Sequence, residues 1–467
     1  MEQHGDSLRH HCGVVGIHSI NPDNIPEQLF YSLFALQHRG QESAGICYRK
    51  ETPEDGSGRL VTYKDLGMVS SVLGHYLEKP HPSTVGIGHV RYSTHGGNRI
   101  ENAQPLAAGC NKGSIALAHN GNISNAGLLN RELSEEGSIF QSSSDTELTL
   151  HMIARSRAAD FDSALRETIS RLEGAFSMVM IHEDRLIALR DPWGFRPLYI
   201  GFGKNTTVVA SETCALDMLK IREYREVEPG ELIWIDNDGL HCERFGPQTA
   251  PKRCVFELIY FARPDSEVFS ESVHLRRKAM GAALAAQETV EADLVVPVPD
   301  SGNSAALGYA EASGLPLEHG LTRNHYAGRS FIMPTTSLRE LAVRMKLHPV
   351  KAAVKGKRVI LIDDSLVRGT TSRILIALMR EAGAAEVHLR LSAPEIKWPC
   401  YYGIDIPTRE ELISNSLDPA GIAAHIGADS VRFLSREHLE ACLSEGKEYC
   451  YACFTGNYPV PYKPRSL

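Results

Sequence analysis

The sequence lacks long hydrophobic runs: nowhere among its 467 residues do eighteen apolar residues follow one another. A membrane-spanning helix needs about 20 such residues, so no membrane partner is expected. The eleven residues before Cys12, MEQHGDSLRHH, are polar and contain no apolar segment of the kind that a secretion signal requires. We therefore expect a cytoplasmic protein.

The sequence also lacks a strongly basic block and internal repeats. Its net charge is −8, which predicts no nucleic-acid partner but leaves small anions as possible ligands. There is no Gly-Lys-Ser/Thr sequence, which excludes the phosphate loop of nucleotide hydrolases. With 467 residues and 23% charged residues, the chain is long enough for two or three globular cores. Its ten cysteines indicate thiols, metal ligands or a nucleophile in a reducing compartment.

The most informative stretch is Arg358 to Ser372, RVILIDDSLVRGTTS. The apolar run Val359–Ile362 predicts a parallel strand that is buried on both faces. After Gly369, apolar residues at helical spacing predict a helix that ends at Gly383. Strand, loop and helix in this order place the loop at the ligand-binding edge of an open α/β sheet.

The chemistry of this loop suits a sugar phosphate. Free N–H groups and hydroxyls at a helix start bind phosphate, whereas the carboxylates of Asp363 and Asp364 suit sugar hydroxyls and, through water, Mg²⁺. Taken separately, each half is also compatible with ordinary turn or capping chemistry. The stretch resembles the phosphoribosyl-diphosphate loop of type I phosphoribosyltransferases. The resemblance implies that the ligand contacts Asp363, Asp364, Ser365, Arg368, Gly369, Thr370, Thr371 and Ser372.

Two further segments belong to this half. DLVVPVPDSGNS predicts another strand, loop and helix, and by resemblance Ser301 supports Mg²⁺ together with the two aspartates; a helix N-cap is an equal alternative. The segment from Arg323 to Glu340 is basic and contains Gly328, so it could close over a diphosphate, with Arg329 meeting the charge. A solvated basic loop is the alternative.

The amino-terminal half contains a second set of motifs. They are CGVVGI from Cys12, LQHRGQESAG, GHVRYSTHG, AHNGNISN and SSSDTE. Each has an ordinary explanation on its own: a buried cysteine, surface arginines, an Asn-Gly turn or a helix cap. In this order and spacing they resemble the glutaminase domain of amidotransferases that use an amino-terminal cysteine nucleophile. The resemblance implies an αββα sandwich of two antiparallel sheets between helices, covering Cys12 to Phe245.

The resemblance also assigns roles to residues. Cys12 would attack the glutamine amide, with its own α-amino group as the base, which requires removal of residues 1–11 as a propeptide. Asn120 and Gly121 would donate to the oxyanion. The residues expected to bind glutamine are Arg39, Arg91, Thr94, His95 and Asp145.

Four more cysteines follow in the second half: Cys254, Cys400 and the CxxC pair Cys450 and Cys453. The spacing alone fits zinc, a redox pair or packed thiols. The flanking words, however, resemble those around the four ligands of a 4Fe-4S cluster in one branch of the glutamine phosphoribosyl-diphosphate amidotransferases.

Taken together, the chain from Cys12 to about Tyr458 resembles this leader-bearing, iron-sulfur branch. The resemblance implies that glutamine-derived ammonia is transferred to phosphoribosyl diphosphate, the committing step of purine synthesis, with purine nucleotides as feedback inhibitors and a homotetramer as the assembly. We expect a glutaminase domain at 12–245, a linker at 246–253 and an α/β phosphoribosyltransferase domain at 254–467 that includes the cluster-binding segment. The alternatives are another class II glutamine amidotransferase and a non-enzymatic regulator that senses phosphoribosyl diphosphate.

Overall fold

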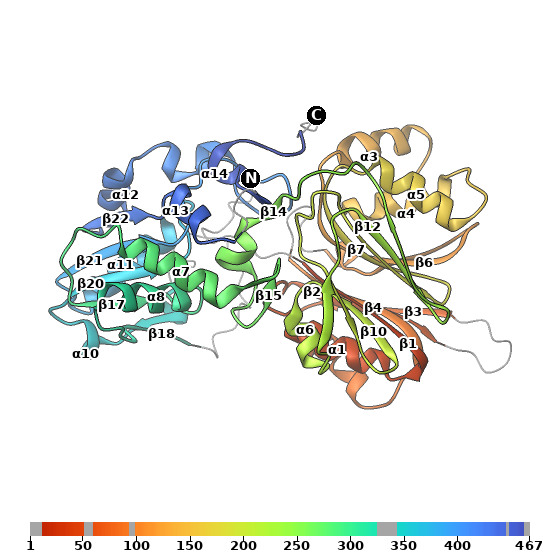
Figure 1. Ribbon diagram of the computed structural model, residues 1–467, viewed down its shortest axis with the longest axis horizontal. Coiled ribbons are helices and arrows are strands. Elements are labelled where there is room, and N and C mark those ends of the chain that lie inside the picture. Colours follow the sequence, from red (N-terminus) through yellow and green to blue (C-terminus); the bar gives the residue numbers. More distant parts are fainter. Residues whose placement is uncertain (1–11, 51–58, 93–98, 325–342, 445–447, 462–467) are drawn as a thin grey trace.

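A computed structural model describes residues 12–50, 59–92, 99–324, 343–444 and 448–461. It contains two units, which lie side by side in Figure 1. The first, on the right of the figure, is built from two large antiparallel sheets. The second, on the left, is built around a parallel sheet with helices on both faces.

The first sheet of the amino-terminal unit has seven antiparallel strands. In sheet order they are β11 (Glu223–Glu226), β9 (Tyr199–Phe202), β10 (Thr206–Ala210), β1 (Gly13–Asp23), β4 (Ser83–Arg91), β2 (Ser43–Lys50) and β3 (Arg59–Leu66). The strand that begins directly after Cys12 is therefore central, with partners on both sides. A central strand holds its first residue more firmly than an edge strand would.

The second sheet has six antiparallel strands. In sheet order they are β13 (Gly239–Arg244), β12 (Glu231–Asp236), β8 (Arg185–Arg190), β7 (Gly174–His182), β6 (Gly113–Ile123) and β5 (Leu106–Cys110). Asn120 and Gly121 lie inside β6 and pair with Ser177 and Phe176 of β7, so the Asn-Gly pair is part of a strand and not a hairpin turn.

Helices cover the outer faces of both sheets. On the first sheet these are α1 (Ile25–Ala35), α2 (Val69–Leu73) and α6 (Thr213–Met218), and on the second α3 (Ala126–Glu135), α4 (Asp145–Arg155) and α5 (Phe161–Arg171). The period-2 alternation of β1 explains the layers, since Val14 packs between the two sheets whereas Val15 and Ile17 pack under the helices. The predicted αββα sandwich is confirmed.

The carboxyl-terminal unit contains four parallel strands, in the order β17 (Leu294–Pro297), β20 (Arg358–Asp363), β21 (Glu386–Leu391) and β22 (Ser430–Phe433). Helices α7 (Val273–Ala285) and α8 (Asn303–Ser313) cover one face, and α11 (Thr370–Glu381) and α12 (Pro419–Ile426) the other. Ile360 faces the first group and Val359 and Leu361 the second. The unbroken apolar run is therefore needed because both faces are covered. The predicted α/β domain is confirmed.

Shorter elements complete the two units. They are the helical turns η1 (Gly74–Leu77), η2 (Ile100–Asn102), η3 (Glu257–Phe261, π-helical), η4 (Arg409–Glu411), η5 (Ile413–Asn415), α10 (Lys351–Val354), α13 (Arg436–Ala441) and α14 (Ala452–Thr455), with the paired strands β14 (Arg253–Cys254) and β23 (Tyr449–Cys450), β15 (Glu267–Val268) and β16 (Glu271–Ser272), and β18 (Leu321–Arg323) and β19 (Leu347–Pro349). None of the helices in the described ranges is long and apolar enough to cross a membrane.

The segment that connects the units is held against the sandwich. The backbone N–H of Lys252 donates to the carbonyl of Trp193 at 2.7 Å, and the N–H of Cys254 donates to the carbonyl of Phe195 at 3.0 Å. The Gly- and Pro-containing stretch 246–253 is thus a packed connection and not a free tether.

Candidate functional site

Cys12 lies at the entrance of β1, close to the end of β4. Its side chain is half-buried, and its Sγ lies 3.8 Å from the carbonyl oxygen of Tyr92, which follows the last residue of β4, Arg91. Burial raises the pKa of the Cys12 thiol; the hydrogen bond to Tyr92 and the charge of Arg91 oppose this rise. The negative charge of the Asp145 carboxylate raises the pKa of the same thiol further.

Asn120 is the most unusual polar group in this region. It is fully buried in β6, and neither its Nδ2 nor its Oδ1 has a hydrogen-bond partner among the described residues. A buried amide without partners costs about 1–3 kcal/mol of stability, so such a group needs an explanation. A ligand oxygen that accepts from this amide would supply the missing partner.

Asp145 is fixed at the start of α4. Ser144 caps the helix by accepting from the N–H of Thr146, and the Oδ2 of Asp145 accepts from the N–H of Ile123 at 2.8 Å. The buried His119, next to Asn120 in β6, places its Nδ1 3.6 Å from the Oδ1 of Asp145. The carboxylate is therefore tied to the strand that carries Asn120 and Gly121.

Arg39 lies in a buried set of charges next to Cys12. Its side chain is fully buried and forms ion pairs with Glu212 and Glu257, the latter at 2.8 Å. Its Nε also donates to the carbonyl of Cys12 at 3.1 Å. Although burial opposes ionisation, the two carboxylates hold the pKa of this guanidinium above its usual range. Arg39 thus pairs with two carboxylates and supports the Cys12 backbone from behind, while its predicted part in glutamine binding stays a prediction.

The second site lies at the carboxyl end of β20. Asp363 and Asp364 are both buried, and Ser301 donates from its Oγ to the Oδ1 of Asp363 at 3.4 Å. Burial, together with the charge of Asp364, raises the pKa of Asp363 well above its usual range; burial also raises the pKa of Asp364. Ser365 donates to the Asp364 carboxylate. Three oxygen-bearing side chains from two loops thus meet in one place, which is the donor chemistry that Mg²⁺ prefers.

The loop after the aspartates leads into α11, as predicted. Gly369 is the N-cap of this helix, in the left-handed conformation with φ 81°, and as a glycine it has no side chain to cap the first N–H groups of α11. Thr370 and Thr371 are half-buried there, and Ser372 is buried. Arg368 forms an ion pair with Glu411 at 2.7 Å, so a phosphate would have to compete with that carboxylate for it.

The four cysteines of the second half gather in one buried region. Cys254 of β14 stands opposite Cys450 of β23 in a parallel pair, and the carbonyl of Cys453 accepts from the N–H groups of Lys397 and Trp398, close to Cys400. Burial raises the pKa of each of these thiols, and Cys450, Cys400 and Cys254 raise that of Cys453 further. Within the described ranges, however, no group of three or more His, Cys, Asp or Glu side chains is arranged to hold a metal ion.

The comparisons with known proteins agree for both halves. Residues 89–218 match the family described as a glutamine amidotransferase domain. Over 462 residues the chain is 48% identical to amidophosphoribosyltransferase 1, chloroplastic, of Arabidopsis thaliana, covering 98% of this chain and 80% of that protein. With the amidophosphoribosyltransferase of Bacillus subtilis it shares 46% identity, covering 97% of this chain and 95% of the relative. This chain belongs to the amidophosphoribosyltransferase family.

A solved structure supports the same membership. The glutamine phosphoribosylpyrophosphate amidotransferase of B. subtilis, complexed with ADP and GMP, superposes with a TM-score of 0.89 at 45% identity, covering 98% of this chain and 99% of that chain. The family resemblance that the motifs predicted is therefore confirmed. The roles of individual residues remain predictions.

Three residues that were predicted to bind ligands, Thr94, His95 and Arg329, lie outside the described residues. The structure adds others that the motifs did not single out. Glu257 and Glu212 hold Arg39, and Asn122 contacts the second unit. A signal for Glu257 was available, because a carboxylate inside the apolar run VFELIYF is buried only with a partner.

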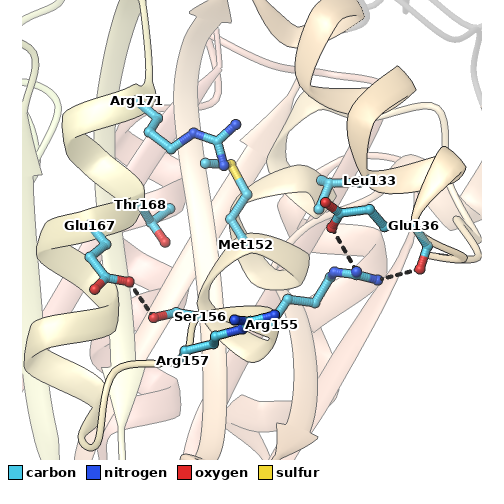
Figure 2. Close-up of a pocket in the computed structure, with 9 residues that line it drawn as sticks. All are labelled: Leu133, Glu136, Met152, Arg155, Ser156, Arg157, Glu167, Thr168 and Arg171. Carbon is cyan, nitrogen blue, oxygen red and sulfur yellow. Dashed lines mark hydrogen bonds and ion pairs between the residues drawn. The ribbon is translucent and has the colours of Figure 1, made fainter.

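Figure 2 shows a separate pocket of about 420 Å³ between α3, α4 and α5. Met152 contributes to its lining, while Arg155 pairs with Glu136 and Ser156 donates to Glu167. No predicted site residue lines this pocket. Because none of the predicted site residues lies here, we assign this pocket no part in the reaction.

Proposed function

We propose that this protein carries out the amidophosphoribosyltransferase reaction: glutamine, phosphoribosyl diphosphate and water give phosphoribosylamine, glutamate and diphosphate, the first committed step of purine synthesis. The observation that carries the proposal is that one chain contains both sites, and that relatives bearing this name cover 98% of it. Neither a glutaminase alone nor a phosphoribosyl-diphosphate sensor would need both.

The first reaction uses the amino-terminal site. The Cys12 thiol attacks the side-chain carbonyl carbon of glutamine, and its proton passes to the α-amino group of Cys12. Asn120 Nδ2 and the N–H of Gly121 donate to the oxyanion. When the C–N bond breaks, ammonia leaves and a thioester remains, which water hydrolyses to glutamate. Arg91 and Asp145, with Thr94 and His95, hold the carboxylate and ammonium of the substrate.

The second reaction uses the carboxyl-terminal site. The ammonia attacks C1 of phosphoribosyl diphosphate, and the bond from C1 to the diphosphate oxygen breaks. The N–H groups and hydroxyls from Gly369 to Ser372 hold the 5-phosphate, while Asp363 and Asp364 orient the ribose. Bound Mg²⁺ would neutralise charge on the departing diphosphate, and the buried oxygen set of Ser301, Asp363 and Asp364 fits that ion. Arg329 is proposed to meet the same charge.

The test is glutamate release measured with and without phosphoribosyl diphosphate, together with phosphoribosylamine formation. We expect both products, and glutamate release should rise when phosphoribosyl diphosphate is added. Another class II amidotransferase would ignore phosphoribosyl diphosphate. A non-enzymatic regulator would release no glutamate.

The proposal includes removal of residues 1–11, because an α-amino group locked in a peptide bond cannot accept the thiol proton. Intact mass of the active protein should show a chain that begins at Cys12. Full glutaminase activity with the leader still attached would contradict this step.

We also propose that Cys254, Cys400, Cys450 and Cys453 bind a structural 4Fe-4S cluster. Four thiols in one region, three of them buried and that of Cys400 half-buried, fit the soft sulfur donors that such a cluster takes, although the side chains would have to turn toward a common centre. Protein purified without oxygen should contain about four iron and four sulfide per chain. Cys400→Ser should lose the iron, whereas Cys442→Ser, a buried thiol of the same unit outside the set, should keep it.

Four broader features belong to the same proposal. The domain boundary is placed within 246–253, giving 12–245 and 254–467. Purine nucleotides are proposed as feedback inhibitors, supported by the ADP and GMP in the B. subtilis structure. A homotetramer and a cytoplasmic location complete it; all ten cysteines are free thiols, which suits a reducing compartment.

A further inference from the structure

The strand that carries Asn120 and Gly121 is contacted by a segment of the other unit. Asn122, two residues after Asn120 in β6, donates from its Nδ2 to the carbonyl oxygen of Tyr401 at 2.9 Å. These residues lie 279 positions apart in the sequence. The contact therefore joins the glutaminase sandwich directly to the phosphoribosyltransferase unit.

A second contact involves two glycines. A Cβ added to Gly403 would lie 3.1 Å from the carbonyl carbon and 3.2 Å from the carbonyl oxygen of Gly121. On its other side, a Cβ added to Gly121 would lie 2.1 Å from the carbonyl oxygen of Ala175 in β7. A side chain thus has no room at Gly121 and would be tight at Gly403, so the segment Tyr401–Gly403 packs closely against the Gly121 backbone.

The segment Tyr401–Gly403 is itself held firmly. The Tyr402 ring stacks on Phe195 with centroids 4.3 Å apart, and its hydroxyl donates to the carbonyl of Val460 at 2.7 Å. The carbonyl of Tyr402 accepts from the buried Arg196 at 2.6 Å. A segment anchored in three ways can fix the position of whatever packs against it.

Arg196, which binds the Tyr402 carbonyl, is also connected to Cys12 through two ion pairs and a hydrogen bond. Arg196 pairs with Glu257 at 3.3 Å, Glu257 pairs with Arg39 at 2.8 Å, and Arg39 donates to the carbonyl of Cys12. One buried set of charges therefore contacts both the backbone of Cys12 and the segment behind Gly121. The relative position of nucleophile and oxyanion donors is set by groups that come from both units.

We infer that Asn122 and Gly403 are positioning residues of the glutaminase: through them the segment Tyr401–Gly403 of the phosphoribosyltransferase unit fixes the strand that presents the Asn120 and Gly121 donors to the oxyanion. This inference rests on the proposed function. An oxyanion hole stabilises the transition state only if its donors are in place before charge develops. A displacement of about 1 Å can cost about 100-fold in rate.

The test begins with Asn122→Ala, which removes the hydrogen bond and leaves the reacting groups in the chain. The kcat for glutamine hydrolysis should fall about 10-fold while the KM for glutamine changes less than about twofold, because the lost contact matters mainly in the transition state. Synthesis from external ammonia should be unchanged. In Asn122→Asp the side chain keeps the shape of asparagine but cannot donate a hydrogen bond, so kcat should fall at least as far as in Asn122→Ala. Normal activity in this variant would overturn the hydrogen-bond role.

A binding measurement separates positioning from a general structural effect. An aldehyde analogue of glutamine forms a C–S bond with Cys12, and the thiol proton ends on the former carbonyl oxygen, which occupies the oxyanion position. Its affinity should fall by the same factor as kcat in Asn122→Ala. Unchanged affinity and kcat would overturn the inference, as would an equal loss of synthesis with glutamine and with ammonia.

Asn415 of the carboxyl-terminal unit provides a matched control, because its side-chain amide also donates to backbone carbonyls. Its Nδ2 donates to the carbonyls of Lys397 and Arg409, both at 2.9 Å. Asn415→Ala should leave kcat, KM and aldehyde affinity unchanged, and a loss equal to that of Asn122→Ala would overturn the assignment. A wild-type protein that releases no glutamate would instead refute the proposed function, before any variant is made.

Discussion

The two units build their candidate sites from different lengths of chain. In the sandwich, Cys12, Arg91, Asn120 and Asp145 come from four separate segments, held together by two sheets and a helix. In the α/β unit, most of the site lies within one strand, loop and helix between Arg358 and Ser372. A site within one segment depends on local geometry, whereas a site from four segments depends on packing between them.

The two sites also hold polar groups in opposite states. Asn120 is neutral, and its side chain has no hydrogen-bond partner among the described residues. Asp363 and Asp364 are two buried carboxyl groups, and burial together with the charge of Asp364 raises the pKa of Asp363. In the proposed reaction, the first site would meet an oxyanion that appears only during catalysis. The second would meet a cation and a sugar that bind before it.

The largest effect is expected for Cys12→Ser, a variant that should affect the amino-terminal site and leave the carboxyl-terminal site intact. Glutamine-dependent synthesis should fall by about 10⁴-fold or more, since the nucleophile is gone. Synthesis from external ammonia should persist, because the second site is intact. Product formation with each nitrogen donor is the measurement, and equal loss with both donors in a folded protein would contradict the two-site division.

The converse variant is Asp363→Asn with Asp364→Asn. It removes the negative charges that hold Mg²⁺, so synthesis should fall by about 10³-fold with either donor. Basal glutamine hydrolysis should survive, while its stimulation by phosphoribosyl diphosphate should disappear. Residual stimulation at the wild-type level would show that the ligand is held elsewhere.

A smaller effect is expected for Asn120→Ala. The kcat of glutamine hydrolysis should fall by about 100-fold, as for other oxyanion donors. The thermal unfolding midpoint should not fall, because removing a buried amide without partners offsets the packing that is lost. Calorimetry and steady-state kinetics on the same preparation test both parts; a large loss of stability would mean that the amide has a structural partner.

The smallest effect concerns pH and the acid pair in the absence of divalent cations. The folded-state pKa of Asp363 is raised above its unfolded value of about 3.9, so from pH ~4 up to that raised pKa the folded state binds more protons. Within this window stability should fall as pH rises, by up to about 1.4 kcal/mol per pH unit for one proton. Urea unfolding of wild type and Asp363→Asn measures the difference. If the stability of the wild type and of the variant changed in parallel with pH, this prediction would be contradicted.

Local sequence was sufficient for the α/β site. The apolar run Val359–Ile362, the acids that follow it and the helix from Thr370 are neighbours in the chain, so periodicity and turn chemistry fix their arrangement. The strand is buried on both faces, as its unbroken apolar run predicts. The αββα layering followed from motif order and family resemblance, and the alternation in β1 agrees with it.

Only the tertiary structure decided which distant groups meet. The sequence placed Arg39 in the glutamine site but did not indicate that its guanidinium binds Glu212 and Glu257, which lie 173 and 218 positions away. A buried charge must find an opposite charge, yet nothing in the local sequence says which one. The same holds for Asn122 and Tyr401. The sequence determined the two folds and the chemistry available to each, whereas packing between the units determined which groups contact the Cys12 backbone and the strand of Asn120.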